Sequence, residues 1–571
     1  MKHNRSLLVL AASMGTLTLA GCGASPPSGA ASPATSAPVV IALPVETSPN
    51  WFFPVFSTNT FSATNIELDA LMYKPLLNVT PKDTVDYKHS LVSSITWNKS
   101  ATVFTLTMNP RYHWSNGHPV TARDVAFTWS IMKAASSNAK DLPWNYGGEG
   151  SGGVPADFKS VTAVNSRTLR VSLTTAVNPQ WLILNGLGQI NPVPASVWNK
   201  HPHNLVSELR FIESQANSPT SPLFKVVDGA YQFGHVQPNQ SWSFVANKNY
   251  GGRLSSVSSV VFQYETSSAS EFSALKTGAL TVGYLPLSLW KSRGALTHDQ
   301  VIPGYVWGMT YLQPNESATA PDGTGLLFHQ LYVRQALAYG INQPAIIQAF
   351  YHGNGIMEDG PIPQKPATPY YDTALNTPVY PFSPARGKAL LLSHGWQERG
   401  GIMTKNGKPL AFTLNYNAGS QTVTDIAQLL KSDWAQEGVQ VNLVSTPFDS
   451  LIALPANKWS MIWLGLGSWI YSPDYYPTGG ALFKTDAALN GEDYSNSTMN
   501  ALIGKTYAPY TSTAEELSRL DRYQAFAAHH IPVIWMPYAA SDYVVSDSLH
   551  GYQHSMNLVS GLIYPNMWTE R

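Results

Sequence analysis

Few residues of this sequence carry a charge. Asp, Glu, Lys and Arg make up 12% of the 571 residues, about half the usual share. The 35 basic residues balance 35 acidic ones, so the chain lacks the basic surface that nucleic acids require, and no nucleic-acid partner is expected. Disorder does not explain the deficit, because disorder requires low hydrophobicity with high net charge, whereas 44% of the residues are apolar and 11% are aromatic.

Cysteine is nearly absent as well. Cys22 is the single cysteine, which excludes a disulfide within the chain and a metal site made of several cysteines. Long uninterrupted apolar runs are lacking after the N-terminal region, so no later segment is expected to cross a membrane as a helix.

The N-terminal region has the pattern of an export signal. Lys2 and Arg5 precede the apolar run 7–19, which is typical of a secretory signal and too short to span a membrane stably. Leu19-Ala20-Gly21-Cys22 resembles the site at which bacterial lipoprotein precursors are cleaved. The resemblance implies that the signal peptide, residues 1–21, is removed. It also implies that lipid on Cys22 anchors the protein to the cell membrane, outside the cytoplasm, at the cell surface or in the periplasm.

The residues that follow the cysteine are small and uncharged. Residues 23–38 contain no large apolar side chain, so they cannot bury enough surface to offset the entropy of ordering. We therefore expect residues 22–38 to be a lipidated cysteine and a disordered tether. The remaining chain is too long for one ordinary hydrophobic core, and two or three subdomains are expected.

Strand and helix patterns are mixed throughout this body. Apolar residues alternate with threonine over 104–108, as in a half-buried strand. Thr121 and Asp124 together form a typical helix start. Apolar residues repeat at helical spacing over 333–341 and 426–434, and Gly438 follows the second of these helices. The sequence therefore predicts a mixed α/β protein.

Several short motifs occur in a fixed order along the chain. Residues 91–129 run from a tryptophan-containing strand, through the turn Trp114-Ser115-Asn116-Gly117, into Pro119-Val120-Thr121-Ala122-Arg123-Asp124-Val125. Later matches fall at 228–231 with 247–250, 274–278 with 283–286, 333–337, 389–396 and 532–551. Together they resemble the signature of the family 5 extracellular solute-binding proteins, the oligopeptide- and dipeptide-binding components of ABC importers.

The resemblance implies a two-lobed clamshell of the class II periplasmic-binding-protein type, with a subdomain inserted in the first lobe. Mapped by the motifs, residues 39–75, 226–300 and 520–571 would form the first lobe, 76–225 the inserted subdomain and 301–519 the second lobe. The lobes would be joined by two crossover segments.

The function that the resemblance implies is capture of a solute by closure of the lobes, followed by delivery to the ABC permease subunits in the membrane. An oligopeptide is the first choice of ligand. An oligosaccharide, or a role as a ligand-sensing surface lipoprotein, stays open. A nickel ligand is the least favoured of the binding roles. The protein is expected to be a monomer without a cofactor or a bound metal.

The ligand site departs from the family pattern at one position. Peptide-binding members hold the ammonium group of the peptide with an aspartate that lies shortly before an acidic residue and a proline. Aligned on Pro473, that aspartate falls on Trp469, and Asp474 is the nearest acidic residue that could supply the charge from a shifted position. The segment 463–474 therefore contains most of the candidate ligand-binding residues. Aromatic residues elsewhere in the chain are expected to line the ligand site as well. The candidate ligand-binding residues are Trp51, Trp307, Tyr311, Trp463, Ser468, Trp469, Tyr471 and Asp474.

No enzyme is expected. Residues 273–278 contain both Ser-x-x-Lys and Lys-Thr-Gly, which penicillin-recognising hydrolases also use. In those enzymes the motifs lie on separate elements, so that their side chains converge on one carbonyl, and six consecutive residues cannot do this. His113 and His118, like the adjacent pair His529 and His530, lack the spacing of a zinc protease.

The low charged fraction also suggests an environment. Relatives often have an Asp-Arg pair where this chain has Asn342 and Gln343. Carboxylates that stabilise a fold are neutralised by acid, so a surface with few of them changes less. We hypothesise an acidic external habitat.

Overall fold

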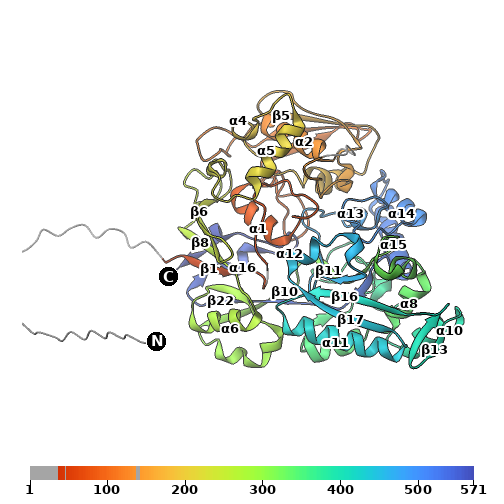
Figure 1. Ribbon diagram of the computed structural model, residues 1–571. Coiled ribbons are helices and arrows are strands. Elements are labelled where there is room, and N and C mark those ends of the chain that lie inside the picture. The colour runs from red at the N-terminus through yellow and green to blue at the C-terminus, as the bar shows by residue number, and fades with distance from the viewer. Residues whose placement is uncertain (1–36, 46, 137–141, 571) are drawn as a thin grey trace, which may run out of the picture. The chain divides into compact units, whose positions relative to one another are not determined.

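The computed structural model describes residues 37–45, 47–136 and 142–570, and these form one compact unit from residue 37 onward. The predicted signal peptide, Cys22 and all but the last two residues of the tether lie outside the described residues. The three largest sheets of the described residues have seven, six and four strands, and helices pack around them (Figure 1).

The first lobe contains a sheet of seven strands in the order β10-β22-β9-β1-β8-β7-β6. Its strands come from distant parts of the sequence. β1 (Val39–Ala42) pairs in parallel with β8 (Ser259–Gln263) and β9 (Val282–Tyr284), while β22 (Ser541–Ser546) runs antiparallel to β9 and to β10 (Asp299–Gly304). β6 (Tyr231–Gln237) and β7 (Ser241–Ala246) form a hairpin at the other edge. The start, the middle and the end of the chain thus meet in one sheet.

The inserted subdomain has an antiparallel sheet in the order β2-β3-β5-β4. Its strands are β2 (Val92–Trp97), β3 (Val103–Met108), β4 (Phe158–Ala163) and β5 (Thr168–Leu173). Helix α2 (Ala122–Ala135) packs against β4 and β5. The predicted start of α2 is confirmed, because the Thr121 N–H donates to the Asp124 carboxylate at 2.8 Å.

The second lobe contains the sheet β17-β16-β18-β11-β19, and β20 also pairs with β11. β16 (Ala411–Asn417) lies parallel to β17 (Gln440–Thr446) and β18 (Met461–Trp463), and α11 (Gln421–Gln436) connects β16 to β17. β11 (Gly308–Pro314) lies antiparallel to β18, β19 (Trp469–Ile470) and β20 (Ile534–Met536). Helices α8 (Leu331–Tyr339) and α11 fall where the helical spacing predicted them.

Two short segments connect the sheet of the first lobe to the sheet of the second. Residues 305–307 connect β10 to β11, and residues 537–540 connect β20 to β22. The second crossover lies later than the sequence indicated, because β20, assigned there to the first lobe with 520–571, is hydrogen-bonded into the second-lobe sheet. The next strand, β21 (Tyr538–Ala539), also pairs with a second-lobe strand, β12 (Gly355–Ile356). We therefore propose residue 541, at the start of β22, and not residue 520, as the point where the chain returns to the first lobe. The Tyr538 hydroxyl donates to the carbonyl of Val306, so the two crossovers are also bonded to each other.

Candidate ligand-binding site

A cavity of about 360 Å³ lies beside the crossovers, and both lobes line it. Its first-lobe wall is made by α1 (Ala63–Met72), α6 (Ser268–Thr277), the end of β9 and the start of β22. Its second-lobe wall is made by Asn417 at the end of β16, by the first turns of α11, and by residues 466–470. A ligand here would contact both lobes at once, which is the geometry that lets a ligand favour closure.

Three carboxylates lie in the first-lobe wall of this cavity. They are Glu67 on α1, Glu271 on α6 and Asp542 on β22. Glu271 accepts a hydrogen bond of 2.8 Å from the Tyr284 N–H, whereas neither carboxylate oxygen of Asp542 has a hydrogen-bond partner among the described residues. No Lys, Arg or His occurs among the described residues that line the cavity.

Burial makes these acids weaker than usual. It raises the pKa of Glu67 to about 7, of Glu271 to about 8 and of Asp542 to about 6. The Glu265 carboxylate adds to the effect on the pKa of Glu271, and the N–H of Tyr284 opposes it. Ionising these acids therefore has a free-energy cost, which a cation bound beside them would offset.

None of the eight predicted residues, all of which lie in the described part of the chain, lines this cavity. Trp307 is fully buried and packs on Tyr471 with ring centroids 4.8 Å apart. The hydroxyl of Tyr471 donates to the Pro361 carbonyl. Trp463 is fully buried in the second-lobe core. Trp51 stacks edge-on against Trp144 at 5.5 Å, and its indole N–H donates to the Val55 carbonyl.

Tyr311 and Ser468 hold the wall of the site and do not face it. The Ser468 hydroxyl accepts from the Tyr311 N–H and donates to the Tyr311 carbonyl, both at 3.1 Å. This pair of bonds fixes the loop before β19 onto β11. Residues 466, 467 and 470 of the same segment line the cavity, although none of them is among the predicted ligand-binding residues.

Trp469 bridges the two lobes. Its ring stacks on Phe61, just before α1, with centroids 6.1 Å apart and planes 11° apart. Its indole nitrogen has no hydrogen-bond partner within the described ranges. The residue that stands where relatives have the ammonium-binding aspartate thus makes an aromatic contact across the lobes.

Asp474 points to the inserted subdomain. Its carboxylate accepts a hydrogen bond of 2.6 Å from the Ser151 hydroxyl, and burial raises its pKa to about 7. Asp474 is 6% exposed. This acid is satisfied inside the protein and does not reach the interlobe cavity.

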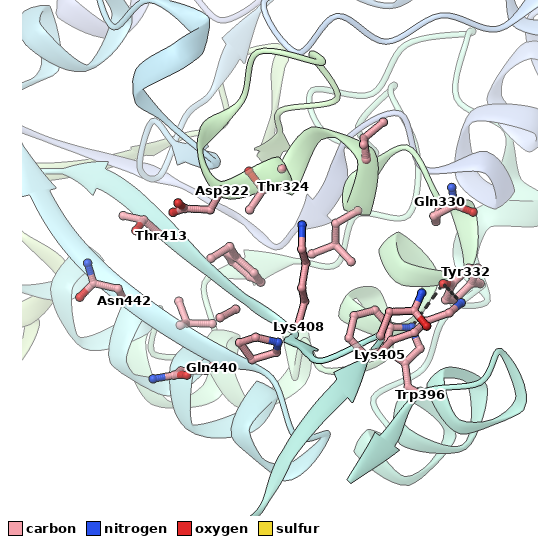
Figure 2. Close-up of a pocket in the computed structure, with 18 of the residues that line it drawn as sticks. Asp322, Thr324, Gln330, Tyr332, Trp396, Lys405, Lys408, Thr413, Gln440 and Asn442 are labelled. Carbon is pink, nitrogen blue, oxygen red and sulfur yellow. Dashed lines mark hydrogen bonds between the residues drawn. The ribbon is translucent and has the colours of Figure 1, made fainter. Parts of the chain in front are cut away.

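A larger hollow of about 1000 Å³ lies on the second lobe alone (Figure 2). Tyr332, Trp396 and Lys405 gather at one side of it, where the indole N–H and the ammonium group both donate to the Tyr332 hydroxyl, at 3.3 and 3.4 Å. Lys408 projects into the middle of the hollow (Figure 2). A ligand in this hollow would touch one lobe only, so its binding would not favour closure.

Among the described residues, no helix has the length and apolar character needed to cross a membrane. The same residues contain no group of three or more His, Cys, Asp or Glu side chains placed to hold a metal ion.

Comparison with known proteins gives a consistent picture. The family model described as "Bacterial extracellular solute-binding proteins, family 5 Middle" matches residues 86–485. The oligopeptide-binding protein AppA of Bacillus subtilis is 22% identical over 513 residues, which cover 89% of this chain and 87% of that protein. The nickel-binding periplasmic protein of Escherichia coli is 23% identical over 427 residues, covering 73% of this chain and 72% of that protein.

Solved structures share the fold. The structure of AppA from Bacillus subtilis in complex with a nonapeptide has a TM-score of 0.80 at 19% identity, covering 94% of this chain and 99% of that one. NikZ from Campylobacter jejuni in complex with Ni(L-His) has a TM-score of 0.73 at 17% identity, covering 93% and 99%. The two-lobed α/β architecture is therefore that of these binding proteins.

Proposed function

Because the chain belongs to the family 5 bacterial extracellular solute-binding proteins, we propose that it is the substrate-binding component of an ABC import system. It captures a peptide between its lobes and delivers the peptide to a membrane permease. The observation that carries the proposal is the cavity lined by both lobes beside the two crossovers. The oligopeptide-binding relative AppA supports a peptide as the ligand.

The lining of the cavity suits a peptide. It contains no tryptophan among the described residues, and its aromatic side chains are those of Tyr284, Tyr538 and Tyr543. Small residues, among them Ala418, Gly467 and Gly561, also line it and allow the close approach of an extended peptide.

Location follows from the N-terminal sequence. We infer a lipid anchor on Cys22 that holds the mature protein to the cell membrane, near the permease. The support is the cysteine motif after the apolar run, together with the small, uncharged residues that follow it.

Native mass spectrometry of the protein purified from bacterial membranes tests function and anchor together. We expect satellite peaks whose extra mass is released on denaturation and fragments as short peptides. We also expect the chain itself to begin at Cys22 with added lipid mass. Extra masses that fragment as oligosaccharides, or that correspond to a metal ion, would contradict the peptide assignment.

Replacing Trp469 by alanine should weaken binding of the peptide identified in that way. The stacked contact with Phe61 joins the lobes, and such pairs contribute about 0.5–1.5 kcal/mol beyond their buried area, which is roughly a threefold to tenfold change in affinity. Asp474→Asn serves as the comparison, because that side chain bonds Ser151 away from the cavity. Isothermal titration in which Asp474→Asn loses more affinity than Trp469→Ala would show that Asp474 binds the ligand.

A further inference from the structure

Three acidic side chains converge on the interlobe cavity from segments that are far apart in the sequence. The sheet register explains part of this arrangement. β22 pairs with β9 so that Tyr543 lies opposite Tyr284, and the Leu285 N–H donates to the Asp542 carbonyl at 2.7 Å. The N–H of Tyr284 in turn donates to Glu271. Asp542 and Glu271 are therefore held on either side of one short strand end.

Among these three acids, Asp542 has a carboxylate that is both buried and, within the described ranges, without hydrogen-bond partners. The residue is 3% exposed, and both oxygens of its carboxylate lack a hydrogen-bond partner among the described residues. A buried carboxylate without partners destabilises a fold unless something else in the site compensates it. Asp542 is nevertheless in the lining of the cavity and not in a sealed core.

Within the described part of the chain, no positively charged group compensates these acids. The described lining contains no Lys, Arg or His. None of the ion pairs formed by the described residues includes Glu67, Glu271 or Asp542. The second-lobe wall contributes uncharged groups, among them Asn417, Ser420 and Thr422.

We propose that the ligand brings the missing cation, and that an ammonium or guanidinium group of the bound peptide pairs with Asp542 and Glu67 in the first-lobe wall, next to Glu271. This inference rests on the proposed peptide-binding function. It places the recognition of positive charge in the first lobe, whereas the position aligned with the ammonium-binding aspartate of relatives is Trp469 in the second lobe. Peptides with a positive group are selected, and peptides whose only charge is negative are rejected.

The cation has two sources with the same chemistry, the N-terminal ammonium group and a Lys or Arg side chain. Three synthetic tetrapeptide pools separate them. The first pool has free N-termini and no basic side chain. The second is the same pool after N-acetylation. The third is N-acetylated and contains one Lys or Arg in each peptide. Retention of each pool is measured by native mass spectrometry on the full chain without its signal peptide.

The variants are Asp542→Asn and Glu67→Gln, which keep size and remove charge. The matched control is Asp83→Asn. Asp83 is also a buried carboxylate whose two oxygens lack partners among the described residues, and burial also raises its pKa to about 7, but it lies outside the cavity. Its backbone φ of 56° is one that asparagine adopts readily.

We expect the wild type and Asp83→Asn to retain the first pool, the third pool or both, and to retain the second pool poorly. Asp542→Asn and Glu67→Gln should retain the charged pools about tenfold to a hundredfold less. Retention of the first pool alone assigns the cation to the N-terminus, and retention of the third assigns it to a side chain. Thermal melting checks the fold, since a charged pool should raise the melting temperature of the wild type and not that of Asp542→Asn.

Equal retention of the second pool by the wild type would overturn the inference. So would undiminished retention of the charged pools by both Asp542→Asn and Glu67→Gln. In either case the peptide function itself would stand, because peptides were bound. If the wild type retained none of the three pools, the proposed peptide-binding function would be contradicted, and this inference with it.

Discussion

Lowering the pH from 7.5 to 5 should raise the free energy of unfolding of this protein. Burial raises the pKa of several carboxyl groups far above the value near 4 that they have in an unfolded chain. The pKa is raised to about 9 for Glu437, about 8 for Glu492 and about 7 for Asp83. The folded state therefore keeps protons that the unfolded state loses as the pH rises above 4, so the contribution of these groups to stability is fully present below about pH 4 and is lost as the pH rises toward 9.

The size of the effect follows from linkage. Each such group contributes a slope of up to about 1.4 kcal/mol per pH unit between its unfolded and folded pKa values. Urea unfolding at pH 5, 6 and 7.5 measures the total slope. A protein that unfolds more easily at pH 5 than at pH 7.5 would contradict the expectation.

Glu437 allows one contribution to be isolated. It ends α11, is fully buried, and has no hydrogen-bond partner for either carboxylate oxygen among the described residues. Glu437→Gln should reduce the slope of the free energy of unfolding against pH by close to the contribution of one buried carboxyl group. Asp322→Asn, at an exposed site, is the control and should leave the slope unchanged. Gain of stability in acid would suit the external habitat that the scarcity of charge suggests.

Replacing Arg334 by alanine should destabilise the protein by about 3–5 kcal/mol, the usual effect of breaking a buried ion pair. Arg334 is 1% exposed on α8 and pairs with Glu316 at 2.8 Å. Its guanidinium also donates to the carbonyls of Phe328, His530 and Ile531. Without it, the exposed His329 is the one partner that the described residues still offer to the Glu316 carboxylate.

Ile531 adds to this expectation. It caps α15 (Thr513–His530) with a φ of +46°, which is strained for a β-branched residue. Arg334 accommodates that strain by bonding the Ile531 carbonyl at 2.8 Å. Urea unfolding measures the change, and Arg522→Ala, an exposed arginine on α15, is the control, with an expected change within about 0.5 kcal/mol.

A double variant, Arg334→Met with Glu316→Gln, distinguishes charge from packing. It should be more stable than Arg334→Ala, because it leaves no unpaired buried carboxylate. An Arg334→Ala protein as stable as the wild type would show that the ion pair contributes nothing.

Local features of this chain could be predicted well from the sequence. The start of α2 follows from hydrogen bonds between neighbours such as Thr121 and Asp124. α8 and α11 follow from apolar spacing, and the family motifs indicated the two crossovers. The sequence placed Ile534–Met536 in the first lobe, whereas this strand pairs with β11, because an apolar strand pattern does not say which sheet the strand joins.

The candidate site was harder to predict. A tryptophan that walls a cavity and one that fills a core have the same sequence signal, and Trp307 and Trp463 are in the core. Glu67, Glu271 and Asp542 lie on α1, α6 and β22, and only the tertiary fold brings these elements to one cavity, so no local pattern links them. The departure at Trp469 was visible in the sequence, but its stacking partner Phe61 lies about 400 residues earlier in the chain and only the fold brings the two together.

The two crossovers determine how the lobes are able to move. Residues 305–307 and 537–540 are short, run side by side and are bonded through Tyr538. Two such tethers restrict twisting and sliding and leave rotation about one axis, unlike a single flexible linker. The motion then has one degree of freedom, so a ligand must leave by the reverse of the route by which it entered. The time a ligand spends bound is then set by the rate of that rotation as well as by the contacts in the cavity.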